Sequence, residues 1–470
     1  MTTEFPYEIW LHILSFLDTK TIRQLRFVNT LLYNLSLDDY HRITQIGYPH
    51  PFTDNAPLLC VISGINLNLV QLSLNHRDPG NAKRARILII RRGPIYPRKY
   101  KPSRSRLGPR WPTWKSIKAN FSQMRCRIVG HEPETLLDKL LNAVPGLTTL
   151  TTLDISLPYS LDDHPFYWTK LDVIKAGWPI FAANLTNLHL DVPLEEIHVV
   201  LLSHIMLLRL EIFSIILRTL PTSEPNELIR KSLLPFLIDH GPTLRSLTLV
   251  ARENMNISSM LNSLQHMPYL SDLNITHLFF SPEFTASLVG YRHFLEAHQS
   301  QIQHLAFNFA ARSPFFNIDS SEFLNQEWCR VPLPGLQSLL FGLSGFRVSC
   351  GAAAIPYIQR HIPTVTSLTI RSLHFSYDQV ASILTGPKSG GYQLTALRAL
   401  DIEIWCFSPA FLSLLVDRAP QLRSLRLNAS VIGPDKQPER FGRNRVPEVG
   451  LHSPSSMYLP QIIIICITVL

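Results

Sequence analysis

The chain has 470 residues, of which 46% are hydrophobic and 17% are charged, with 35 Pro and 20 Gly. This composition can bury a large core and excludes wholesale disorder. No apolar stretch reaches the roughly 20 residues of a membrane-spanning helix, which excludes a multispan membrane protein. The N-terminus carries no basic region of the kind that opens a signal peptide, so we expect an intracellular protein, in the cytoplasm, the nucleus or both.

The first 46 residues carry the pattern of three short amphipathic helices. Pro6 suits the first position of a helix, and Glu8 would then lie in its first turn, so the sequence predicts a helix start here. Apolar residues then recur at helical spacing up to Leu17, continue through a second helix around Leu25, and extend through a third helix that includes Ile43. Because so small a domain has a thin core, its apolar stripe is a candidate docking surface, or else packs on the downstream domain.

The N-terminal module has a distinctive residue pattern, which reads Phe5-Pro6-x-Glu8-Ile9-Trp10-x-x-Ile13-Leu14-Ser15-Phe16-Leu17-Asp18, followed by Leu25-x-x-Val28-Asn29, Leu32-Tyr33 and Tyr40-x-x-Ile43. This pattern resembles the F-box. It implies a domain that binds a Skp-type adaptor and, through it, a cullin-RING ubiquitin ligase. The resemblance also implies which residues bind the adaptor, namely Phe5, Pro6, Ile9, Ile13, Leu14, Leu17, Leu25, Val28 and Leu32.

A strongly basic segment follows the N-terminal module. Residues 79–131 contain 15 Lys and Arg and no Asp or Glu, whereas the rest of the chain has 29 basic and 35 acidic residues. Within it, residues 93–112 are rich in Pro, which resists helix and buries little. The segment could bind RNA or another anionic surface or direct nuclear import, with its aromatic residues stacking between the basic groups. The alternatives are a solvated loop without function and a gene-model error.

An apolar-x-x-Leu-x-apolar phrase recurs through the rest of the chain. Most copies follow an amphipathic segment that ends in a polar or proline stop, so the unit reads as helix, turn and short strand. The copies are Leu150-Leu153-Ile155, Leu185-Leu188-Leu190, Leu207-Leu210-Ile212, Leu244-Leu247-Leu249, Leu270-Leu273-Ile275, Ile302-Leu305-Phe307, Leu336-Leu339-Phe341, Val365-Leu368-Ile370, Leu397-Leu400-Ile402 and Leu422-Leu425-Leu427.

Units of this kind bury their apolar faces only by stacking, which predicts a solenoid. The pattern resembles leucine-rich repeats over roughly residues 131–432 and departs from them in lacking the Asn that follows each strand. Trp405 is one of the residues that occupy this position. We therefore expect an α/β solenoid, with a three-helix F-box followed by an irregular leucine-rich-repeat-like horseshoe around a parallel sheet.

The alternation of the strands predicts which side chains line the open face, the side of the sheet turned away from the helices. It places Phe213 on this face, among mostly polar residues of both charges. Such a face suits a protein or peptide better than a phosphate backbone, although its side chains could simply be solvated. The candidate substrate-binding residues are Asp272, Asn274, His304, Asn308, Arg371, Asp401, Glu403 and Arg426.

No motif for a nucleophile, a metal centre or a phosphate loop occurs, so we expect neither a cofactor nor a metal, and no catalytic residue. The six cysteines have no zinc or disulfide spacing and read as reduced, mostly buried thiols. Any ligase activity would therefore be borrowed from partners. An enzyme whose site is assembled from distant residues stays open as a weaker hypothesis.

The predicted organisation has five parts. They are an F-box at 1–46, a linker and N-terminal cap of the repeat domain at 47–92, a basic Pro-rich insertion at 93–130, the repeat domain at 131–432 and a poorly ordered tail at 433–470. The β-prone end of the tail could also cap the last repeat as an edge strand. The main functional hypothesis is the substrate-recognition subunit of a Skp-cullin-F-box type ubiquitin ligase. The alternative is a nucleic-acid-binding or nuclear scaffold protein that acts through residues 83–127.

Overall fold

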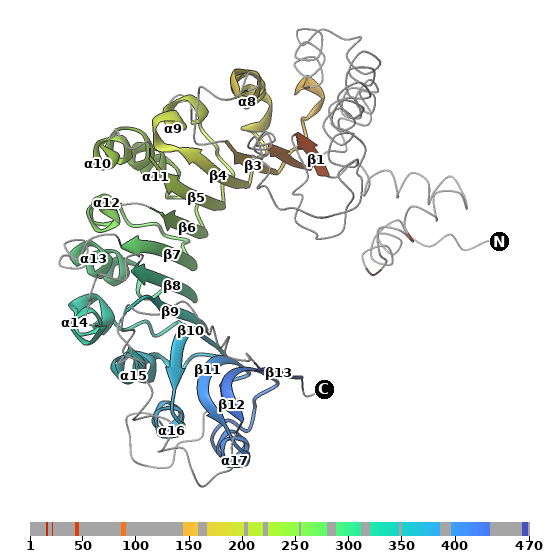
Figure 1. Cartoon of the computed structure of the whole chain (residues 1–470). Coiled ribbons are helices and arrows are strands. Elements are labelled where there is room, and N and C mark those ends of the chain that lie inside the picture. Colours follow the sequence, from red (N-terminus) through yellow and green to blue (C-terminus); the bar gives the residue numbers. More distant parts are fainter. Residues whose placement is uncertain are drawn as a thin grey trace, which may run out of the picture. The chain divides into compact units, whose positions relative to one another are not determined.

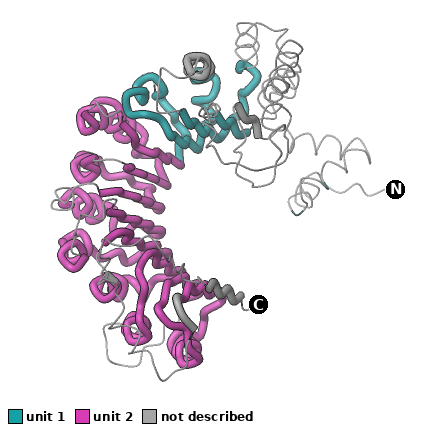
Figure 2. Tube along the Cα trace, viewed as in Figure 1, with its two compact units in different colours: residues 1–211 teal, residues 212–470 magenta. Residues whose placement is uncertain are grey.

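The computed structural model divides into two compact units, Met1–Glu211 and Ile212–Leu470, which are described separately (Figure 2). The structure describes residues 16, 21, 43–46, 86–90, 144–157, 167–201, 205–219, 224–252, 255–279, 288–311, 320–346, 350–385, 396–432 and 463–468. Most of the predicted F-box and all of the insertion at 93–130 lie outside these residues.

Unit 1 pairs parallel strands in sequence order. The strands are β1 (Ile43–Ile46), β2 (Ile87–Ile90), β3 (Thr152–Ser156) and β4 (Asn187–Pro193), and the helical segments are η1 (Val144–Gly146), α8 (Tyr167–Phe181) and α9 (Leu194–Val200). The Nε1 of Trp178 in α8 donates a hydrogen bond of 2.6 Å to the carbonyl of Val200, which ties the two helices together. The prediction that Ile43 belongs to a third helix was wrong, because Ile43 begins β1 and pairs with Ile87 of β2.

Unit 2 repeats the same strand and helix alternation. Its strands are β5 (Ile212–Arg218), β6 (Ser246–Ala251), β7 (Asp272–Phe279), β8 (His304–Ala311), β9 (Ser338–Ser344), β10 (Ser367–Phe375), β11 (Ala399–Phe407), β12 (Ser424–Ile432) and β13 (Ile463–Thr468). Its helical segments are α10 (Pro225–Leu228), η2 (Ile229–Leu233), α11 (Leu234–His240), α12 (Ile257–Ser263), α13 (Val289–His298), α14 (Ser320–Leu324), η4 (Glu327–Arg330), α15 (Cys350–His361), α16 (Tyr377–Thr385) and α17 (Pro409–Arg418).

The strands β5 to β12 lie side by side in chain order and are parallel. Figure 1 shows the helices of this unit along one side of the sheet only. Two adjacent parallel strands must be joined by a crossover connection. Each connection between successive strands from β5 to β12 contains a described helical segment. The predicted α/β solenoid with a parallel sheet is thereby confirmed.

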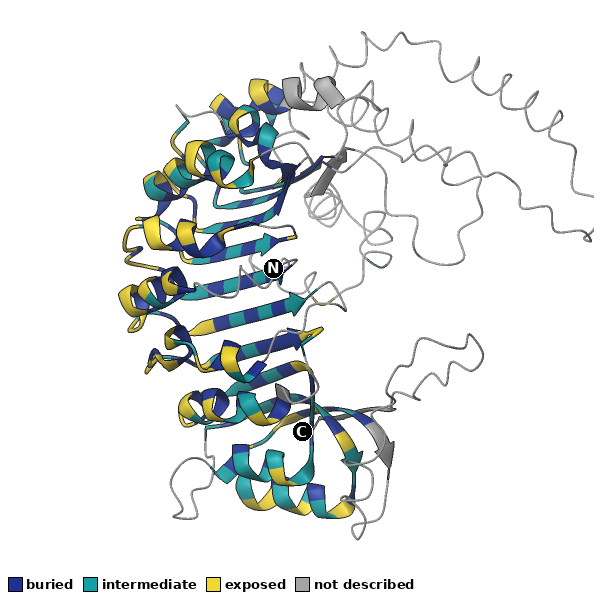
Figure 3. Ribbon diagram, turned by 60° about the vertical axis from the view of Figure 1, so that its left-hand side comes forward, coloured by how far each residue is buried: buried dark blue, intermediate teal, exposed yellow. Residues whose placement is uncertain are grey.

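The recurring phrase supplies the core of each repeat. In β7, buried Leu273, Ile275 and Phe279 alternate with partly exposed residues, and Leu270 is buried in the turn before the strand. The same striping runs along the neighbouring strands in Figure 3. Each such side chain contributes about 1.5–3 kcal/mol by leaving water. The apolar positions therefore face the helices and leave the opposite side of the sheet open.

One repeat has a different register from the one predicted. Ile212 pairs with Ser246, and Phe213 pairs with Leu247 and is fully buried. The phrase in this repeat is therefore Leu210-x-x-Phe213-x-Ile215, three residues later than predicted. The prediction that Phe213 lines the open face was wrong, because Leu207 in the preceding turn mimics the first position of the phrase.

The strands continue past the position where the Asn is missing. Leu278 of β7 pairs with Ala310 of β8, and Ala310 pairs with Ser344 of β9. At this position the backbone N–H and C=O groups can therefore pair with the neighbouring strand instead of with an Asn side chain. The longer strands also carry the alternation of side chains further along the open face.

Strand β13 pairs antiparallel with β12, from Ser424 opposite Thr468 to Ala429 opposite Ile463. For these six residues the apolar C-terminal segment is therefore an edge strand beside the last parallel strand. It follows a segment, 433–462, that lies outside the described residues.

An aromatic cluster fills the middle of the unit 2 core. The ring of Trp328 lies 5.4 Å from the rings of both Phe307 and Phe309 and 5.6 Å from that of Phe323. These rings are almost fully buried between β8 and the segment that carries α14 and η4. Interlocking edge-to-face pairs of this kind fix the stacking of neighbouring repeats.

Candidate protein-binding surface

The candidate substrate-binding residues all lie on the open face of unit 2. Each is partly or fully exposed, in contrast to the buried residues that alternate with them. Asp272 and Asn274 lie on β7, His304 and Asn308 on β8, Arg371 on β10, Asp401 and Glu403 on β11 and Arg426 on β12. The structure therefore places them on one surface but in two groups, which β9 separates.

The group on β7 and β8 is held partly by its own neighbours. Asp272 lies in register with His304, and its carboxylate accepts a hydrogen bond from the hydroxyl of Ser271. The Oδ1 of Asn274 is buried and has no hydrogen-bond partner among the described residues. A buried acceptor without a partner costs about 1–3 kcal/mol.

Gly342 of β9 separates the two groups and lets Asn308 extend across it. A Cβ on Gly342 would lie only 2.7 Å from Oδ1 of Asn308 and 3.6 Å from the carbonyl oxygen of Arg371. The amide of Asn308 thus lies over a residue that has no side chain. This arrangement leaves no large side chain on β9 between Asn308 and Arg371.

The second group is organised by an irregularity in β10. Arg371 is in register with Gly342 of β9, but the pairing with β11 shifts between Thr369 and His374. Ser372 takes a left-handed backbone conformation, with φ of 59°. A non-glycine residue in this region costs about 1–2 kcal/mol and often marks a functional constraint.

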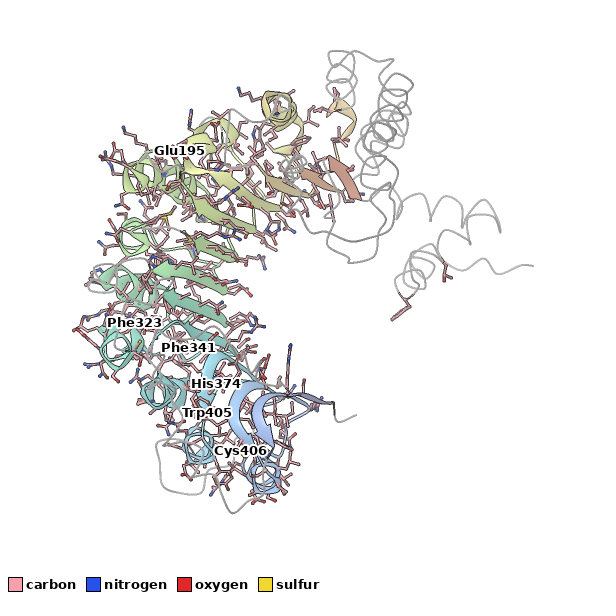
Figure 4. The ribbon with its side chains drawn as sticks, in the orientation of Figure 1. Glu195, Phe323, Phe341, His374, Trp405 and Cys406 are labelled. Atoms are coloured by element: carbon pink, nitrogen blue, oxygen red, sulfur yellow. The ribbon has the colours of Figure 1, made fainter. Side chains whose placement is uncertain are left out.

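The shift directs His374 toward β11. Its Nδ1 lies 3.8 Å from Oε2 of Glu403, and its ring centroid lies 4.9 Å from that of Trp405. Figure 4 labels His374 and Trp405 close to each other in this part of unit 2. The indole of Trp405 is 45% exposed although it is a large aromatic side chain. Glu403, His374 and Trp405 form what we call the Trp405 cluster.

Sequence reasoning named Glu403 but missed His374 and Trp405. The signal for Trp405 was present, because Asp401, Glu403 and Trp405 share the same alternation on β11. Trp405 was instead counted among the residues that replace the missing Asn. His374 could not be assigned to this face by alternation, since the irregularity at Ser372 changes the phase of β10.

Several titratable groups in unit 2 belong to the core and not to this surface. Burial lowers the pKa of His277 and of His361 to about 4 in each case. Burial also raises the pKa of the Cys329 thiol, which makes that thiol a poor nucleophile. Cys329 is buried and Cys406 is partly exposed.

The described residues contain no group of three or more His, Cys, Asp or Glu side chains placed to hold a metal ion. Among the helices that the structure describes, none has the length and apolar character needed to cross a membrane.

The predicted adaptor-binding residues, from Phe5 to Leu32, lie outside the described residues. Between them the structure describes Phe16, whose side chain is 76% exposed, and Thr21, which is helical. Part of the basic segment at 83–127 is described as β2, whose Leu88 and Ile90 are fully buried. Those residues are therefore core of unit 1 and not part of an exposed basic surface.

Comparison with protein families matches residues 3–44 to the family model of the F-box domain. A search of curated proteins found no match to the chain. The F-box supports a role as an adaptor subunit of a Skp-cullin-F-box type ubiquitin ligase. The chain therefore contains an F-box domain at residues 3–44, which precedes a repeating parallel α/β solenoid in the sequence.

Proposed function

We propose that this protein is a substrate receptor of a cullin-RING ubiquitin ligase. The F-box binds a Skp-type adaptor, and the open face of unit 2 binds the protein to be ubiquitylated. The chain supplies proximity between substrate and ligase, while partners supply the chemistry. The F-box match at residues 3–44, followed in the same chain by a repeating open sheet, is the observation that carries this proposal.

The open face of unit 2 supports the second half of the proposal. It presents polar and charged side chains of both signs together with one exposed indole. Protein interfaces favour such a mixture, with a few aromatic or arginine anchors inside a polar surround. A nucleic acid would need a surface of predominantly positive charge.

For the adaptor contact, we propose the apolar residues of the F-box that the sequence singled out. Pro6 and Leu14 are the test positions, because truncation of apolar anchors at an interface removes most of its binding energy. The double variant Pro6→Ala, Leu14→Ala in the full chain should abolish pull-down of a purified Skp-type adaptor. The matched control Trp405→Leu should retain it.

The outcomes separate the two functional hypotheses. Adaptor binding by the wild type and the control, but not by the double variant, supports the receptor. If neither the wild type nor the control binds the adaptor, the proposal fails. Binding of RNA that weakens steeply with salt, in a chain that does not bind the adaptor, would instead favour the basic segment at 83–127.

A further inference from the structure

Among the described residues of unit 2, Trp405 and Tyr269 are the aromatic side chains with large exposure, at 45% and 63%. Tyr269 lies in the turn before β7, whereas Trp405 projects from the open face of β11. An indole kept in water forgoes burial of a large apolar area. Its place on a face otherwise mostly polar makes it a candidate anchor for a partner.

The Trp405 indole is supported on one side. His374 lies against it with a centroid distance of 4.9 Å and an interplanar angle of 36°. The position of His374 is set by the register shift after the left-handed Ser372. Gly351 lets α15 pack close to the backbone of His374, since a Cβ at Gly351 would lie 3.0 Å from the carbonyl oxygen of His374. The ring is therefore held before a ligand arrives, which reduces the entropy cost of binding.

The charge beside the indole is negative. Glu403 lies two residues before Trp405 on the same face of β11, and its in-register neighbours are His374 on β10 and Asn428 on β12. Neither neighbour carries a permanent positive charge. The two guanidiniums of the group lie at other register positions, Arg371 beside Gly342 and Arg426 beside Asp401.

An aromatic face next to a carboxylate is suited to a cationic side chain, and to arginine more than to lysine. A guanidinium stacks on an indole through cation–π attraction, and its planar edge can donate paired hydrogen bonds to a carboxylate. A neutral apolar side chain would use the indole but would desolvate Glu403 without compensation. An anionic group would be repelled by Glu403.

We propose that the Trp405 cluster is a specificity site for an arginine side chain of a substrate protein, with the guanidinium stacked on Trp405 and its charge met by Glu403. This inference rests on the proposed function and names the side chain that the open face selects. His374 is a positioning residue that supports the indole.

The probe is a short fluorescein-labelled peptide with a single arginine between serine and glycine residues, compared with the same peptide carrying citrulline. Citrulline keeps the shape and removes the charge. Fluorescence anisotropy with the full-length protein should give about tenfold weaker binding of the citrulline peptide. Trp405→Leu and Glu403→Gln should each reduce binding of the arginine peptide to the citrulline level. Tyr269→Leu should leave it unchanged.

Equal binding of the two peptides, or arginine binding that survives Trp405→Leu, would overturn the inference. So would an RNA oligonucleotide that binds the wild type but not the Trp405→Leu variant. Adaptor pull-down from the same preparations separates this inference from the proposed function. If the protein binds the adaptor but not the peptide, the proposed receptor function is supported and the arginine site is contradicted. If it binds the peptide but not the adaptor, the arginine site is supported and the receptor function is contradicted.

Discussion

His298 accepts the backbone N–H of Met267 through its Nε2 at 2.9 Å, and so joins the end of α13 to the preceding repeat. Its Nδ1 donates to the carbonyl of Phe294 at 2.7 Å. The two contacts together require the neutral imidazole with its proton on Nδ1. This buried side chain thus satisfies two backbone groups in different repeats.

Replacing His298 with Phe should therefore destabilise unit 2. The ring volume is kept, but the N–H of Met267 and the carbonyl of Phe294 lose a partner in the core. The free energy of unfolding should fall by about 1–3 kcal/mol. Urea unfolding followed by circular dichroism measures it. His293→Phe on the exposed side of the same helix is the control. It removes only a solvent-exposed hydrogen bond to Asn262, whose groups water can satisfy, so it should cost less than His298→Phe. Equal losses in the two variants would contradict this role.

Acid should destabilise unit 2 through its buried histidines. Burial lowers the pKa of His277 and His361 to about 4, and it also lowers the pKa of His298. Below pH 6.5 the unfolded chain binds protons that the folded chain does not, so stability is full above pH 6.5 and falls from there toward pH 4. Each of the first two groups contributes a loss of about 3 kcal/mol over this range.

The measurement is the urea midpoint of the wild type and of His361→Phe between pH 7.5 and 4.5. The variant should lose less stability than the wild type as the pH falls, whatever its stability at pH 7.5. Parallel pH profiles for the two proteins would show that His361 does not titrate as its burial implies.

The backbone of Ser372 offers a test of strain at the Trp405 cluster. Ser372→Gly should leave stability unchanged or raise it by up to about 1 kcal/mol, because glycine adopts positive φ without a steric penalty. Ser372→Val should lower stability by about 1–2 kcal/mol, since a branched side chain fits this region poorly. Thermal unfolding of the two variants is the measurement. A Val variant as stable as the Gly variant would be inconsistent with a left-handed residue here.

Two glycines should respond differently to alanine. A Cβ on Gly290 would lie 1.7 Å from the carbonyl oxygen of Ser258, so Gly290→Ala must push α13 away from α12 and should cost more than about 2 kcal/mol. A Cβ on Gly342 meets the end of the Asn308 side chain, which can rotate away, so Gly342→Ala should cost below about 1 kcal/mol. Chemical denaturation compares the two, and a reversed order would contradict the packing described.

The sequence predicted the repeating architecture because one phrase governs each repeat. Leu273 and Ile275 are buried where the phrase places them, and Asp272 and Asn274 lie on the open face as expected. The phrase failed where a turn residue imitates it, as Leu207 does before β5. The register shift in β10 could not be predicted from the sequence either, since serine is not a residue type that marks a left-handed backbone, as Ser372 has.

The Trp405 cluster could be predicted only in part. Alternation along β11 places Glu403 and Trp405 on the open face. The contact between Trp405 and His374 depends on a strand whose register changes, which is a property of packing between β10, β11 and α15 and not of local pattern. The F-box, in contrast, could be predicted from local sequence, since its residue pattern and the family match agree at residues 3–44.

The proposed function depends most on whether the F-box of this chain assembles with a Skp-type adaptor. Size-exclusion chromatography with light scattering measures the mass of the full-length protein mixed with a purified adaptor. We expect a complex with the mass of the 53.5 kDa chain plus one adaptor, and we expect the Pro6→Ala, Leu14→Ala variant not to form it. Separate elution of the two wild-type proteins at concentrations well above micromolar would contradict it.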